Sequence, residues 1–85
     1  MVDKTLEEIK KGEQAQKILE SQVYQEAFTQ VKDNIIEAMQ TSPLSDDVTH
    51  NRLVIALQTL NQIQRALTSV MQTGKMAQIQ VNDLK

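Results

Sequence analysis

The sequence predicts an all-α fold: an antiparallel helical hairpin with an additional N-terminal helix, assembling into an oligomeric helix bundle. The first observation behind this prediction is a set of apolar residues that recur at helical spacings near the end of the chain. The second is a proline within a cluster of capping residues, which separates two helical patterns. The third is the length of 85 residues, which fits one domain (1–85) that buries only about 60 to 65% of its unfolded surface. Association is therefore expected to contribute to stability.

Composition excludes several classes of protein. A net charge of -2 argues against the broad positive surface of a general nucleic-acid binder. No apolar run reaches the roughly 20 residues that span a bilayer, and residues 1–11 are too charged for a signal peptide. The lack of cysteine excludes a disulfide framework and is compatible with a reducing cytoplasm. These features predict a soluble protein without a membrane partner.

The N-terminal helix is predicted over residues 3–19. Thr5 and Glu8 have the spacing of a capping box, in which each side chain satisfies an orphan backbone donor. The apolar face is thin, because Leu6 and Ile9 share a side but Gly12 interrupts the pattern at a cost of about 1 kcal/mol. Such a helix is expected either to dock on another subunit or to fray in solution.

The second helix is predicted over residues 21–40, with Ser21 as its candidate N-cap. The alternative is one continuous helix from Thr5 to Gln40 whose two faces meet different neighbours. The apolar residues of this stretch share one arc at about 100° per residue. They are Tyr24, Phe28, Val31, Ile35 and Ala38.

The connection over residues 41–46 predicts a chain reversal, because Pro43 cannot continue a helix. Ser45, Asp46 and Asp47 follow it and suit the start of the next helix through capping and the helix dipole. A cap is favoured over a metal site for this acidic pair, since no third ligand lies at a suitable spacing. A short connection makes the flanking helices antiparallel neighbours.

The third helix is predicted over residues 47–73 and carries the strongest apolar pattern. Ala56, Ile63 and Val70 widen this pattern into a face about 140° across, more than one antiparallel partner covers. Either the N-terminal helix or other subunits should cover the remainder. The residues in line along the helix, which we call the ladder, are Leu53, Leu57, Leu60, Leu67 and Met71.

Gln64 occupies a ladder position between Leu60 and Leu67. An amide inside a coiled-coil seam favours one register over others, because it is costly without a partner. The alternative is that glutamine serves as a good helix former on the rim. The ladder, Gln64 and the apolar residues of the second helix together form the predicted self-association surface: Leu53, Leu57, Leu60, Gln64, Leu67, Met71, Tyr24, Phe28, Val31 and Ile35.

Residues 75–85 are predicted to form a flexible or strand-like tail. Gly74 follows the last periodic residue and is a candidate helix stop. Polar and apolar residues then alternate over 78–82, the pattern of a short strand that would pair with a partner's sheet edge through Ile79 and Val81. A disordered or helical tail is favoured over this strand.

No catalytic, cofactor-binding or metal-binding residues are predicted. His50 stands alone near a helix start, where a solvated surface histidine is expected. Gly12 and Gly74 cannot form a glycine-rich phosphate loop, and no His or carboxylate spacing matches a metal motif. Five cations could contact nucleic acid, although acidic residues interleave with those near the N-terminus and favour a solvated helix face. They are Lys10, Lys11, Lys17, Arg52 and Arg65.

Three segments resemble small helical proteins encoded among the head and tail morphogenesis genes of tailed bacteriophages and prophages: Gly12 to Ala15, Glu26 to Phe28, and Val70 to Met76. The resemblance implies a virion or assembly protein found in the host cytoplasm during assembly or in the virion. This sequence has Ser21 and Gln22 where that group has Asn followed by Pro, so its helix break is less firmly marked.

Two functional hypotheses follow. The favoured one is a non-enzymatic phage structural or assembly protein that self-associates through its helices and binds other virion components through the tail or the N-terminal helix. The alternative is a small nucleic-acid-binding or regulatory accessory protein of phage DNA packaging, in which oligomerisation multiplies weak contacts from the five cations.

Overall fold

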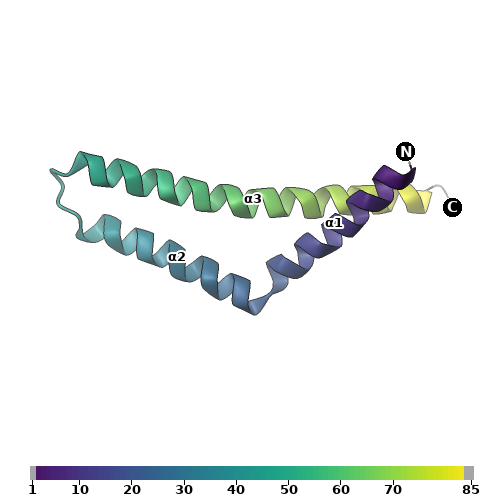
Figure 1. Ribbon diagram of the computed structural model, residues 1–85, viewed down its shortest axis with the longest axis horizontal. Coiled ribbons are helices and arrows are strands. Elements are labelled where there is room, and N and C mark those ends of the chain that lie inside the picture. The colour runs from purple at the N-terminus through teal and green to yellow at the C-terminus, as the bar shows by residue number, and fades with distance from the viewer. Residues whose placement is uncertain (1, 84–85) are drawn as a thin grey trace.

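A computed structural model describes the backbone of residues 2–83 and the side chains of residues 4–83. The described chain is all-helical, with α1 over Val2–Glu20, α2 over Gln22–Thr41 and α3 over Asp47–Asp83. Helices α1 and α2 follow one another along the long α3, and both run antiparallel to it (Figure 1). The all-α prediction is confirmed, and the N-terminal helix packs against α3.

The break between α1 and α2 lies at Ser21, where the backbone is extended with φ -65° and ψ 125°. The Ser21 Oγ accepts a hydrogen bond of 3.3 Å from the backbone N–H of Tyr24. This is an N-cap, which satisfies one of the unpaired donors at the start of α2. The chain therefore contains two helices here, not one continuous helix, and the bend holds their junction away from α3 (Figure 1).

Helix α1 begins at Val2, whereas a helix with Thr5 as its N-cap would begin after Thr5. Thr5 and Glu8 lie inside the helix, so their predicted role as a capping box is wrong. The exposed ion pair of 3.0 Å between Lys11 Nζ and Glu7 Oε1 joins residues one turn apart. A pair of this kind stabilises a helix by only about 0.3 to 0.5 kcal/mol, so docking on α3 is the main support of α1.

The connection between α2 and α3 is the predicted reversal. Ser42 ends α2 and its N–H donates to the carbonyl of Ala38. Asp46 caps α3, because its Oδ1 accepts from the N–H of Thr49 at 3.1 Å and its Oδ2 from the Thr49 hydroxyl at 2.6 Å. His50 is half-buried with its Nε2 enclosed, which corrects the expectation of a solvated side chain.

Asp46→Asn is expected to reduce the loss of unfolding free energy that the chain shows as pH falls. The Thr49 hydroxyl and then the Thr49 N–H hold the pKa of Asp46 below its ordinary value of 3.8. The charged cap therefore stabilises the fold above that value, and its contribution is lost as pH falls through the lower, native pKa. Asparagine also caps helices but does not titrate there.

The measurement is the urea midpoint of unfolding at neutral and acidic pH. The difference between the two should be smaller in Asp46→Asn than in the unaltered chain. Asp47→Asn is the matched control, since it removes the neighbouring carboxylate without removing the hydrogen bonds to Thr49. If both variants reduce the difference between the two urea midpoints equally, the pH dependence comes from the overall negative charge near the turn and not from the Asp46 cap.

Helix α3 continues through Gly74 and ends at Asp83. The predicted helix stop at Gly74 is wrong, because no described glycine has a positive φ. The strand-like tail is also wrong over 75–83, where Ile79 and Val81 are helical. A helical tail is part of the favoured alternative, and the structure has it over these residues. The reason is that α1 packs along this part of α3, so its helical face has a partner within the chain. Residues 84 and 85 lie outside the described residues.

The molecule is long and thin, with extents of 62 × 24 × 16 Å. Its radius of gyration is 18.1 Å, whereas a compact domain of this length has about 12 Å. Among the described residues, Ala15 and Ala77 are the only buried apolar side chains. None of the described helices has the length and hydropathy needed to cross a membrane. The described helices therefore enclose little apolar side-chain volume, with α2 beside α3 and α1 crossing α3 (Figure 1).

Candidate interaction surface

The backbones of α1 and α3 approach closely where the two helices cross at two glycines. A Cβ added to Gly12 would lie 2.8 Å from the Cα of Gly74, and one added to Gly74 would lie 2.9 Å from the carbonyl oxygen of Glu8. Ala15 and Ala77, each three residues after its glycine, are also buried. The repeated Gly-x-x-Ala spacing is the sequence signal for this crossing, which the apolar periodicity did not reveal.

The ladder follows the inner side of α3. Its last residue, Met71, lines a cavity with Ile9 and Gln16 of α1, and the earlier residues lie along the seam between α2 and α3. All five ladder residues are half-buried, as are Tyr24, Phe28 and Ile35 on α2. The rings of Tyr24 and Phe28 are 6.0 Å apart between centroids and tilted by 35°, an arrangement that aromatic pairs favour. The chain therefore brings most of the predicted self-association surface together within one copy.

Two predicted members of that surface lie at its margins. Val31 is 46% exposed, and Gln64 is exposed on α3. Gln64 lines a groove of about 450 Å³ instead of facing the seam, and its backbone carbonyl accepts a hydrogen bond of 2.9 Å from the Thr68 hydroxyl. This position agrees with the alternative in which glutamine is a helix former on the rim.

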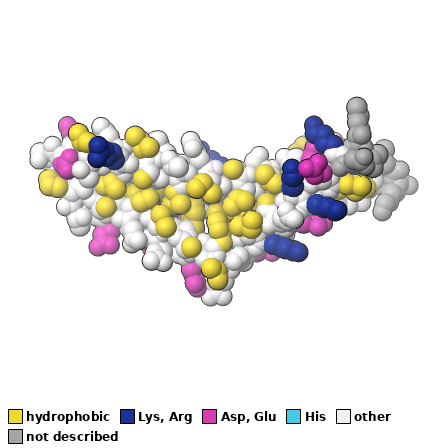
Figure 2. Space-filling view, in the orientation of Figure 1, with side chains coloured by type: hydrophobic (Ala, Val, Ile, Leu, Met, Phe, Trp, Pro, Cys, Tyr) yellow, Lys and Arg dark blue, Asp and Glu magenta, His cyan; other side chains and the backbone are white. Residues whose placement is uncertain are grey.

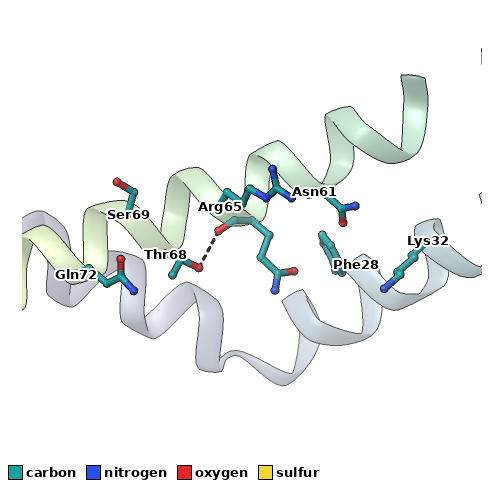
Figure 3. Close-up of a pocket in the computed structure, with 8 residues that line it drawn as sticks. Phe28, Lys32, Asn61, Arg65, Thr68, Ser69 and Gln72 are labelled. Atoms are coloured by element: carbon teal, nitrogen blue, oxygen red, sulfur yellow. Dashed lines mark hydrogen bonds between the residues drawn. The ribbon is translucent and has the colours of Figure 1, made fainter. Parts of the chain in front are cut away.

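The groove beside Gln64 gives one flank of the α2–α3 pair a polar character (Figure 3). Phe28 points from α2 toward α3, and Lys32 lies one turn further along α2 (Figure 3). We call this side the polar flank. The residues that line its groove are Phe28, Lys32, Asn61, Gln64, Arg65, Thr68, Ser69 and Gln72.

The other side of the same pair is apolar. On a helical wheel, Ile63 and Val70 lie on the opposite side of α3 from Arg65 and Gln72. Ile63 is 53% exposed and Val70 is 40% exposed. Figure 2 shows a band of hydrophobic side chains over α2 and α3, with charged side chains near its ends and along its edge. On the same wheel Ala56 lies beside Ile63, and on α2 the residues Ala27, Val31 and Ala38 lie on the side of the helix away from Lys32. We call this side the apolar flank; it comprises Ala27, Val31 and Ala38 on α2 and Ala56, Ile63 and Val70 on α3.

Charge is sparse along the middle of α3. Arg65 is the only charged residue from Leu53 through Thr73, and it lines the polar flank. Protein interfaces are depleted of charged residues at their centres. The apolar flank therefore has the composition of a protein contact.

The five candidate nucleic-acid contacts are not brought together. Lys10, Lys11 and Lys17 are exposed on α1, which packs on the later part of α3. Arg52 lies near the start of α3, about 33 Å along the helix from the crossing at Gly74. The structure forms no shared basic surface from these side chains.

The tail residues have separate environments. Ile79 is exposed and Val81 is half-buried on the last turns of α3. Within the described residues, no group of three or more His, Asp or Glu side chains could hold a metal ion.

The comparisons with protein-family models, curated proteins and solved structures give no match.

Proposed function

We propose that this chain is a non-enzymatic structural or assembly protein of a tailed phage, acting through helix-mediated self-association in the host cytoplasm during particle assembly. The resemblance to morphogenesis proteins supports the biological setting. The exposed area of the isolated chain supports the mode of action.

That area is the observation that carries the proposal. The chain exposes 6739 Å², whereas a compact monomer of 9.6 kDa exposes about 5,100 Å². The excess is about 1,600 Å² per chain. Large apolar side chains contribute to this excess along all three helices. Because the single chain buries so little apolar surface, burying these side chains in a contact is expected to contribute much of the free energy of folding.

The end of the molecule formed by α1 and the last turns of α3 is proposed to contact other virion components. Met76 and Ile79 are both more than half exposed there, and they belong to the segment predicted to bind a partner. As these residues are helical, the expected contact is helix on helix instead of strand addition.

Thermal unfolding at two protein concentrations tests self-association. If folding and association are coupled, a hundredfold rise in concentration should raise the midpoint by about 5 to 10 °C. A midpoint that does not change with concentration would contradict the proposal, because the unfolding of a monomer is independent of its concentration.

A further inference from the structure

We propose that the apolar flank is the contact between two copies of this chain, arranged antiparallel about a two-fold axis that passes close to Ile63. This inference rests on the self-association proposed above and specifies the partner, the face and the orientation. The occupant of the flank is a second copy of the same chain.

The first argument is area. Two chains that each cover the excess of about 1,600 Å² would bury about 3,200 Å² together, within the range of about 2,000 to 5,000 Å² for obligate homodimers. Of the exposed large apolar side chains, Val31, Ile63 and Val70 lie on the flank, so the flank is the centre of this contact and supplies only part of its area. Obligate interfaces are also the more apolar ones. In such a pair, α2 and α3 of one copy pack on α2 and α3 of the other. The result is a four-helix arrangement with a shared core.

The second argument is the lack of charge at the centre of the flank. A two-fold axis brings each residue near it close to its own copy, so a charged side chain there would meet the same charge. Ala56 and Ile63 carry none, and Arg65 faces the other side. The charged Glu8 and Lys11 of α1 line a cavity with Val70, at the end of the flank and away from the axis. The flank can therefore meet a copy of itself without repulsion at its centre.

The third argument fixes the orientation. Ile63 is seven residues from both Ala56 and Val70, so an antiparallel axis at Ile63 sets the small Ala56 against the larger Val70 of the second copy. A parallel pair would set alanine on alanine and leave a gap, which costs packing energy. It would also bring together the acidic turns at Asp46 and Asp47, whereas the antiparallel pair keeps them apart and aligns the helix dipoles favourably.

Ile63→Glu and Gln72→Glu form a matched pair of tests. Both add one negative charge to an exposed position of α3, but on opposite flanks. Light scattering should give twofold mass for the unaltered chain and for Gln72→Glu, and single-chain mass for Ile63→Glu, because two carboxylates meet at the axis. Loss of association in Gln72→Glu alone would overturn the proposal and assign the interface to the polar flank.

Distances between spin labels test the geometry without disrupting the contact by charge. The chain has no cysteine, so Ala56→Cys, Ile63→Cys and Val70→Cys can each carry one label. The separation between copies should be about 10 Å between backbones at residue 63 and about 20 Å at residues 56 and 70. Short separations at all three positions would contradict the antiparallel order, and long ones at all three would contradict the use of this flank.

These outcomes separate this inference from the proposed function. If the unaltered chain has a multiple mass and Ile63→Glu keeps it, self-association stands and the flank is wrongly assigned. If the unaltered chain has single-chain mass, both proposals fail and the flank is left for a different protein.

Discussion

Gly74→Val is expected to lower the free energy of unfolding by about 3 kcal/mol or more. Valine is a slightly better helix former than glycine, so an isolated α3 would gain stability from the change. In the folded chain, however, even the first added carbon would lie 2.8 Å from the Cα of Gly12. Backbone cannot rotate away as a side chain can, so the two helices must separate.

Urea unfolding followed by circular dichroism at 222 nm measures this effect at a fixed protein concentration. Thr73→Val is the matched control, because it places the same residue at a neighbouring exposed position and changes stability by only about 0.5 kcal/mol. Equal stability in the two variants would mean that α1 and α3 do not cross at Gly74. Loss of the crossing should also lower the helical signal, since α1 has little support of its own.

Leu60→Asp is expected to lower the free energy of unfolding by about 3 kcal/mol or more, and to abolish association. Leu60 is half-buried at the middle of the ladder, between α2 and α3. The substitution removes apolar contacts from the seam and places a charge where the surroundings offer little solvation. The effect should appear both in urea unfolding and in the mass in solution.

Gln58→Asp is the control for the ladder. Gln58 is exposed and lies almost opposite Leu60 on the helical wheel, so this variant carries the same helix-propensity cost without a buried charge. It should keep the mass of the unaltered chain and lose less than about 1 kcal/mol. If Leu60→Asp behaves like Gln58→Asp, the ladder does not form the seam.

Most features that depend on neighbouring residues could be predicted from the sequence, with the Thr5–Glu8 capping box as the exception. The turn around Pro43, the cap at Asp46 and the start of α2 at Ser21 all follow from local backbone chemistry, and each is present in the structure. The seam was also predictable, because the ladder and the Tyr24 to Ala38 face both repeat with the period of a helix.

Features that depend on distant contacts could not be predicted in this way. A glycine such as Gly74 can end a helix by adopting a positive φ, or it can permit two backbones to approach closely. Only the presence of Gly12 opposite it decides between these roles. The period-two pattern over 78–82 was misleading for a related reason, because docking of α1 gives this segment a helical partner.

The candidate site was predicted in part. The sequence indicated that the apolar face is wider than one partner covers, and the structure places the excess on one flank, where Ile63 and Val70 are exposed. The sequence could not assign Gln64 to the polar flank, because a ladder position on a wheel does not tell which neighbour the residue faces.

The mass of the purified chain in solution tests the central claim most directly. Light scattering at micromolar concentration should give at least twice the 9.6 kDa of one chain, because the apolar flank and the excess exposed area need a partner. A mass of one chain under the same conditions, with the helical signal intact, would contradict self-association as the way in which this protein acts.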